Sequence, residues 1–156
     1  MNMRKILFVL IPIALVGCQY DPHANLYTTN EPKVEDSVGT YVLDRFDLPI
    51  DTSKVQCDVV VELHADGTFA ATNIPPWKMD DVTTNFFSQL LNGSGKWEKD
   101  TLGTLDDSKR IWGVYLRTPD NRFHPVDFTG SKPPYGLIFT LGDPDSGYAV
   151  LLKKKQ

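Results

Sequence analysis

Short segments in which apolar and polar residues alternate follow one another from Val38 to the end of the chain. Alternation with a period of two is typical of strands that have one face buried. Eight such segments are expected, over residues 38–43, 57–63, 68–74, 95–99, 110–117, 122–128, 135–141 and 148–152. The pattern therefore predicts an all-β domain made of short strands.

One connection is specific enough to predict a register. Ala65-Asp66-Gly67 separates two of the alternating segments, and Asp-Gly between strands is a strong hairpin signal. A three-residue loop with Gly67 in the left-handed conformation pairs Leu63 with Phe69. Both side chains then lie on the same, core-facing side of the sheet.

A single segment has helical spacing. Val82, Phe86 and Leu90 recur every four residues within residues 80–91, and Asn92-Gly93 is a typical helix stop. A helix of this length is marginal alone, so we expect it to pack on the sheet.

The number and order of these elements favour a small antiparallel meander barrel of about eight strands with one short helix, because closure removes exposed strand edges. A β-sandwich is the alternative. The strands, at five to eight residues, are shorter than the roughly 9–11 residues of a membrane-spanning strand.

The N-terminus has the features of a signal peptide. Arg4 and Lys5 precede an apolar run, Ile6 to Val16, that only Pro12 interrupts. This run is too short to cross a bilayer, which takes about 20 apolar residues. A basic start followed by a short apolar core predicts a secretory signal peptide over residues 1–17.

Leu15-Val16-Gly17-Cys18 resembles the lipobox of bacterial lipoproteins. The resemblance implies that Cys18 is acylated and becomes the first residue of a mature protein anchored in the cell envelope. Gln19 stands where an Asp would favour inner-membrane retention, which implies the outer membrane, facing the periplasm, in a Gram-negative host. An ordinary signal peptide is the alternative.

Residues 18–37 are polar, contain Pro22 and Pro32, and show no strand or helix period. We expect a flexible tether that carries lipidated Cys18 and holds the domain, residues 38–156, off the membrane.

Three phrases resemble lipocalin-like bacterial domains: Gly39-Thr40-Tyr41, the Leu63 to Phe69 hairpin, and Gly95-Lys96-Trp97. Tyr41 stands in place of the Trp of that family, and no Thr-Asp-Tyr segment or closing Arg is evident. The segment from Gly142 to Gly147 is similar to one in uncharacterised bacterial envelope proteins. These resemblances imply a lipocalin-like barrel and no particular activity.

Charge and cysteine content limit which binding partners and disulfide bonds are expected. The chain has 16 Lys and Arg against 20 Asp and Glu, so no basic excess favours a nucleic-acid partner. If Cys18 carries lipid, Cys57 has no partner within the chain, and no disulfide is expected. Cys57 opens a Val-rich strand, which favours packing as a small apolar residue over a reactive thiol.

No residue pattern predicts catalysis, a metal or a cofactor. The three histidines, His23, His64 and His124, are not at ligand spacing, and no Gly-x-Ser-x-Gly elbow is present. Asp143-x-Asp145-x-Gly147 has the opening spacing of a calcium loop, but Lys154 occupies position twelve, so a tight turn is favoured. We therefore expect a protein that is not an enzyme.

Most aromatic residues are expected to fill the barrel. Trp77 and Phe123 lie beside prolines in predicted loops, which makes them candidates for exposed binding residues, together with His124 and Phe128. The leading hypothesis is a membrane-anchored binding module for a small apolar ligand or a protein partner. An immunity or inhibitor lipoprotein that neutralises a toxin or enzyme is the second hypothesis, and an enzyme of unknown reaction is the third.

Overall fold

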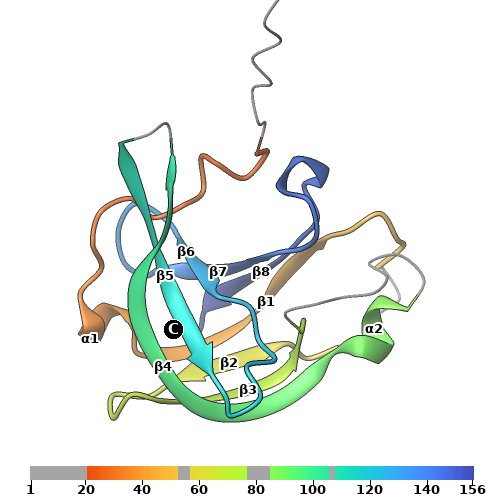
Figure 1. Ribbon diagram of the computed structural model, residues 1–156, viewed down its shortest axis with the longest axis horizontal. Helices are drawn as coiled ribbons and strands as arrows, with labels where there is room; N and C mark the ends of the chain where they lie inside the picture. The colour runs from red at the N-terminus through yellow and green to blue at the C-terminus, as the bar shows by residue number, and fades with distance from the viewer. Residues whose placement is uncertain (1–20, 53–56, 77–84, 106–107) are drawn as a thin grey trace, which may run out of the picture.

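The computed structural model describes residues 21–52, 57–76, 85–105 and 108–156, and it shows a closed antiparallel barrel (Figure 1). Each strand pairs with the next, and the last returns to the first. This confirms the predicted all-β meander barrel rather than a sandwich. The strands are β1 Gly39–Asp47, β2 Val60–Leu63, β3 Thr68–Ile74, β4 Leu91–Leu105, β5 Lys109–Arg117, β6 Val126–Thr129, β7 Gly136–Thr140 and β8 Ala149–Lys154.

The helices are short: α1 Val34–Ser37, α2 Phe86–Gln89 and the 3-10 turn η1 Pro144–Ser146. The helix predicted over residues 80–91 is present only as α2, and its first part, up to residue 84, lies outside the described residues. Asn92-Gly93 does not end a helix but lies inside β4. A Cβ on Gly93 would lie 2.6 Å from the ring of Phe123, so glycine is needed there for close packing.

Strand β4 is far longer than the predicted segment of residues 95–99. Its first part pairs with β3 and its later part pairs with β5, so one bent strand serves two neighbours (Figure 1). Strand β6 begins at Val126 instead of Arg122, and Phe123 before it forms an isolated bridge with Pro76.

The hairpin between β2 and β3 forms as predicted. Leu63 pairs with Phe69, and Gly67 has a φ of 80°. The His64 amide donates to the Thr68 carbonyl, and the Gly67 amide donates to the His64 carbonyl. The Asp66 side chain accepts a bond from the Thr68 amide at 2.9 Å, which stabilises the turn further.

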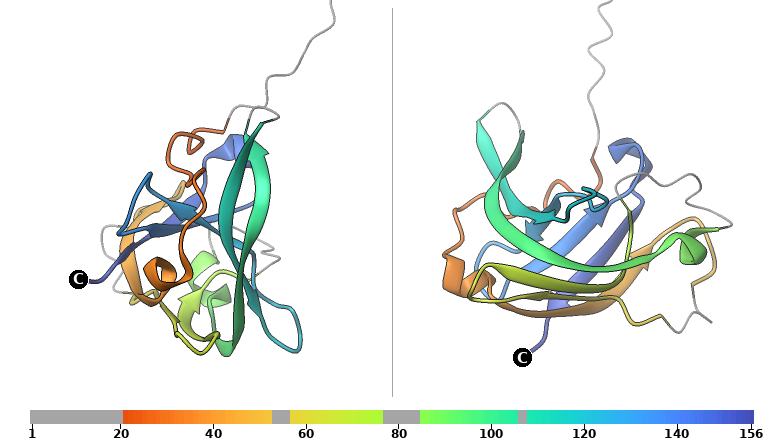
Figure 2. Two further views of the ribbon diagram at one scale, coloured as in Figure 1. Left: turned by 90° about the vertical axis from the view of Figure 1, so that its left-hand side faces the viewer. Right: turned by 60° about the horizontal axis from the view of Figure 1, so that its bottom comes forward.

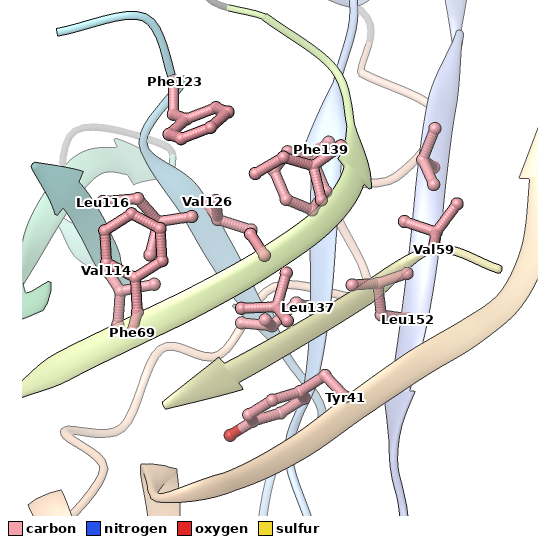
Figure 3. Close-up of a cluster of buried hydrophobic side chains, with 14 of the residues drawn as sticks. Tyr41, Val59, Phe69, Val114, Leu116, Phe123, Val126, Leu137, Phe139 and Leu152 are labelled. Atoms are coloured by element: carbon pink, nitrogen blue, oxygen red, sulfur yellow. The ribbon is translucent and has the colours of Figure 1, made fainter. Parts of the chain in front are cut away.

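Alternate side chains of the strands point inward and meet in one cluster (Figure 3). The alternation within residues 57–63 and 135–141 places Val59, Val61 and Leu63, and likewise Leu137, Phe139 and Leu141, on one face of each segment. All six side chains are at most 1% exposed, which confirms this prediction. Burial of each such side chain stabilises the fold by about 1.5–3 kcal/mol relative to exposure. Large rings share this interior, among them Tyr41, Phe69, Phe86, Phe128 and Phe139.

A cation from the last strand crosses the start of the first. The Lys154 ammonium lies 5.9 Å from the buried Tyr41 ring and donates to the Asp36 carbonyl at 2.7 Å. Gly39 has a φ of 146°, and a Cβ there would lie 2.6 Å from Lys154 Cε. Glycine at position 39 therefore leaves the space that the Lys154 side chain needs to reach Tyr41. Lys154 is thus a cation beside the first strand in a sequence that has no evident closing Arg.

Residues 21–33, here called the N-terminal strap, lie against the outside of the barrel (Figure 2). Leu26 and Tyr27 pack on Ile138, Ala149 and Leu151, which point outward from β7 and β8. The expectation of a flexible tether is therefore wrong for the part of it that begins at Asp21. The reason is that the barrel has an apolar outer face that this segment covers.

The strap also extends the sheet. The β5–β6 ladder is limited to Gly113–Asp127 and Val114–Val126. Beside it, the Thr28 amide donates to the Phe128 carbonyl at 2.9 Å, and the Trp112 amide donates to the Thr28 carbonyl at 3.0 Å. Thr28 therefore bridges the two strands where they separate, and the fold begins well before residue 38.

Candidate functional site

A groove opens where β5 and β6 stop pairing. Beyond Val114–Val126 the end of β5 and the loop of residues 118–125 diverge, leaving a depression of about 290 Å³. We call it the β5–β6 groove. Its lining residues are Tyr115, Leu116, Arg117, Asn121, Phe123 and Pro125.

Local turn chemistry shapes the loop side of the groove. The Thr118 hydroxyl donates to the Asp120 carboxylate at 2.8 Å, and the Asn121 amide donates to the Thr118 carbonyl at 3.0 Å. Asn121 has a φ of 53°, a left-handed conformation that Asn tolerates better than most residues. The hydrogen bond from Thr118, followed by Arg122, lowers the pKa of the exposed Asp120.

Guanidinium groups and aromatic rings meet at the rim. The Arg117 guanidinium lies 4.8 Å from the centre of the Tyr115 ring and 3.1 Å from the Glu98 carboxylate. Arg122 lies 6.0 Å from the Phe123 ring and 2.7 Å from the Asp120 carboxylate. Stacked guanidinium groups bind carboxylates and aromatic surfaces well, so the rim suits contacts with another protein.

The structure joins the loop that carries the candidate residues Phe123 and His124 to Pro76, the residue before Trp77. Phe123 bridges Pro76, and His124 is half-buried with a hydrogen bond to the Pro76 backbone. Burial lowers the pKa of His124, and that hydrogen bond acts in the opposite direction. Trp77, the remaining candidate, lies outside the described residues.

The expectation of exposed rings at Phe123 and Phe128 is wrong. Phe123 is 4% exposed and Phe128 is fully buried. The Phe123 ring packs edge-on against Phe69 at 6.0 Å, and Phe128 packs against Tyr135 at 5.9 Å. Both side chains point into the barrel. Phe123 does so from the loop before β6, and Phe128 does so from β6 itself, where strand alternation turns it inward with Val126.

We therefore expect Phe123→Ala to lower the free energy of unfolding by about 3–5 kcal/mol, as other buried Phe truncations do. Urea unfolding of the purified protein measures the change. Arg122→Ala, beside it on the surface, is the control and should change stability by less than about 1 kcal/mol. Equal stability of both variants would mean that the Phe123 ring is exposed after all.

Sequence reasoning missed Tyr115, Arg117 and Asn121 as site residues. The alternation that places Val114 and Leu116 inward also places Tyr115 and Arg117 outward, so their exposure was readable. The groove itself was not readable, because it depends on where the β5–β6 ladder ends.

A second groove, of about 390 Å³, runs beside the strap. Its charged side chains contact the protein itself: Lys153 lies 3.2 Å from Asp44, Arg45 lies 3.1 Å from Asp47, and Lys154 donates to the Asp36 carbonyl. These contacts hold β8 against β1 and α1, so we place the candidate site at the β5–β6 groove.

Other candidate chemistry is limited. No group of three His, Cys, Asp or Glu side chains able to hold a metal ion occurs within the described residues. Residues 143–147 form a turn around η1, in which the Asp145 amide donates to the Asp143 carboxylate at 3.1 Å. Cys57 packs partly buried against the core, and burial raises the pKa of its thiol.

No helix in the described ranges is long and apolar enough to cross a membrane. The chain matches no protein-family model, no curated protein and no solved structure.

Proposed function

We propose that the protein is a lipid-anchored binding module of the bacterial cell envelope that holds a protein partner at the β5–β6 groove. The groove itself is the observation that carries this proposal. Its volume, about 290 Å³, lies just below the range of about 300–1,000 Å³ typical of small-molecule sites. It suits one or two side chains of a partner, gripped between Tyr115, Arg117 and Asn121.

The packing of the barrel supports a partner outside it. The inward side chains that the structure describes include large rings and branched aliphatic residues in mutual contact (Figure 3). Small barrels of eight strands have room for side chains or for one small ligand, and here the described buried side chains form one large apolar cluster inside the barrel. A protein partner is therefore favoured over a small apolar ligand inside the barrel.

Binding without turnover is the proposed mode of action. Among the described groove residues, the charged groups are already paired, Arg117 with Glu98 and Arg122 with Asp120. Nucleophilic catalysis needs a nucleophile within hydrogen-bond reach of a base, and these lining residues supply no such pair.

Photo-crosslinking tests the groove directly. A benzoylphenylalanine residue placed at position 115 in living cells should give one discrete protein adduct, and Arg117→Glu should reduce its yield severalfold. The same probe at exposed position 104, on the far end of β4, is the control and should give no such adduct. Equal adducts from both positions, or none from position 115, would contradict the proposal.

The membrane anchor has its own test, based on the resemblance of Leu15-Val16-Gly17-Cys18 to a lipobox. Labelled palmitate should enter the wild-type protein and should be lost completely in Cys18→Ser. Cys57→Ser is the matched control, because it removes the other cysteine of the chain and should keep the label. Label that persists in Cys18→Ser would show that the lipobox interpretation is wrong.

A further inference from the structure

The strap fixes the place where the N-terminal part of the chain meets the barrel. The Asp21 carboxylate accepts bonds from the Tyr27 hydroxyl at 2.7 Å and the His23 amide at 2.8 Å. The buried His23 ring lies 3.0 Å from the Gly147 carbonyl, next to η1. Asp21 is therefore held beside η1. The start of the strap lies at the top of the molecule in Figure 1.

Chain length then limits how far Cys18 can be from this point. Three Cα–Cα steps join Cys18 to Asp21 and span at most about 11 Å. A flexible tether over residues 18–37 would instead have a root-mean-square length of about 25 Å. Because the strap is packed, an anchor at Cys18 would bring one side of the barrel to the membrane surface.

We infer that the barrel rests on the bilayer through the side that carries the start of the strap, which we call the anchor face. This inference rests on the proposed lipidation of Cys18. Leu105 and Ile111 pack against the same cluster that contains the strap residue Tyr27, so the outer ends of β4 and β5 belong to the same side (Figures 1 and 2). Exposed residues of the anchor face are Pro22, Asn25, Ser108, Lys109, Arg110, Asp143, Asp145 and Ser146.

The charge of the anchor face indicates what kind of membrane contact it makes. Lys109 and Arg110 are offset by Asp143 and Asp145, so the face has no excess charge of either sign among these residues. Polybasic segments need several uncompensated cations to bind anionic lipid. The lipid on Cys18 therefore supplies the affinity, and the orientation should be the same on neutral and anionic bilayers.

This orientation presents the β5–β6 groove away from the membrane. Strand β5 runs from Lys109, near the anchor face, to Arg117, at the groove, a distance of about 26 Å for an extended strand. The loop after β5 and the β2–β3 hairpin lie on the opposite side from the start of the strap (Figures 1 and 2). A partner can therefore reach the groove while the barrel is anchored.

Fluorescence quenching in vesicles tests the orientation with the full-length, acylated protein. Single cysteines at positions 145 and 108, on the anchor face, and at position 65, on the opposite hairpin, carry the fluorophore in a Cys57→Ser background. The vesicles are phosphatidylcholine with nitroxide-labelled headgroups. We expect severalfold stronger quenching at positions 145 and 108 than at position 65, with or without anionic lipid.

A spacer variant provides the matched control. Twelve Gly and Ser residues inserted between Tyr20 and Asp21 leave the strap intact but lengthen the link, so the difference between the labels should disappear. Acylated protein whose three labels are quenched equally without the spacer would overturn the orientation alone. A protein whose mass shows no acyl group and which does not float with vesicles would overturn the anchoring and the orientation together.

Discussion

Replacing Tyr27 with Ala should lower the free energy of unfolding by about 3–5 kcal/mol, although Tyr27 lies outside the eight strands of the barrel. The ring is 9% exposed and packs on the outward-facing side chains of Ile138 and Leu151. Its hydroxyl donates to Asp21 at 2.7 Å, so the substitution removes both a buried ring and a hydrogen bond. Urea unfolding of the purified protein without its signal peptide measures the effect.

Two variants separate the causes of this loss. Tyr27→Phe keeps the ring and removes only the hydrogen bond, which should cost about 1 kcal/mol. Val34→Ala alters a side chain that is 49% exposed just after the strap, and its effect should be within about 0.5 kcal/mol. If Tyr27→Ala is no worse than Tyr27→Phe, the strap does not contribute to the stability of the barrel.

The second large effect concerns Asp127 of β6, which lies under the strap. Burial, with the nearby Asp21 carboxylate as a second cause, raises the pKa of Asp127 from 3.8 to about 7. The native state therefore binds this proton more tightly than the unfolded chain does. Protonation of Asp127 therefore stabilises the native state fully below a pH of about 4, and this contribution is lost as the pH rises through about 7.

Asp127→Asn should remove this dependence. Each unit of pKa difference corresponds to about 1.4 kcal/mol, so the variant should gain up to about 4 kcal/mol relative to wild type between pH 4 and pH 8. Urea unfolding at several pH values gives the two curves. Asp120→Asn is the control. The fold lowers the pKa of Asp120, so this variant should change the pH dependence of stability in the direction opposite to Asp127→Asn. Parallel curves for wild type and Asp127→Asn would show that Asp127 titrates normally.

Much of the barrel could be predicted from the sequence because period-two alternation is a direct consequence of strand geometry. It correctly placed Leu137, Phe139 and Leu141 on the inner face, and Asp66-Gly67 correctly set the pairing of Leu63 with Phe69. These features depend only on residues close to one another in the chain.

The strap was missed because its contacts join residues that lie far apart in the chain. Thr28 bonds to Phe128 and Gly130, and nothing periodic in residues 21–33 marks it as part of a sheet. A signal was nevertheless present in the continuous apolar runs Leu137-Ile138-Phe139 and Ala149 to Leu152. Strands that are apolar on both faces are covered on both faces, and the second cover is the strap.

The predictions of the helix and of the exposed rings were wrong for a related reason. The spacing of Val82, Phe86 and Leu90 is helical, but Leu91 is drawn into β4 by pairing with Ile74. In such short segments, sheet pairing outweighs local helix propensity and determines the secondary structure. Pro125, next to His124, indicated a loop, whereas the alternation predicted a strand from Arg122 that in fact begins at Val126. Neither pattern revealed that the Phe123 ring turns inward.

Hydrogen exchange most directly tests whether the strap is part of the fold. The amides of Thr28, Trp112 and Gly130 donate to Phe128, Thr28 and Leu26 carbonyls at 2.9–3.0 Å. In the purified protein these three amides should be protected to nearly the same degree as amides of the β7–β8 ladder, because all belong to one cooperative unit. Exchange of the Thr28 and Trp112 amides at the rate of an unfolded peptide, while β7 and β8 stay protected, would contradict a structural strap and restore the flexible tether.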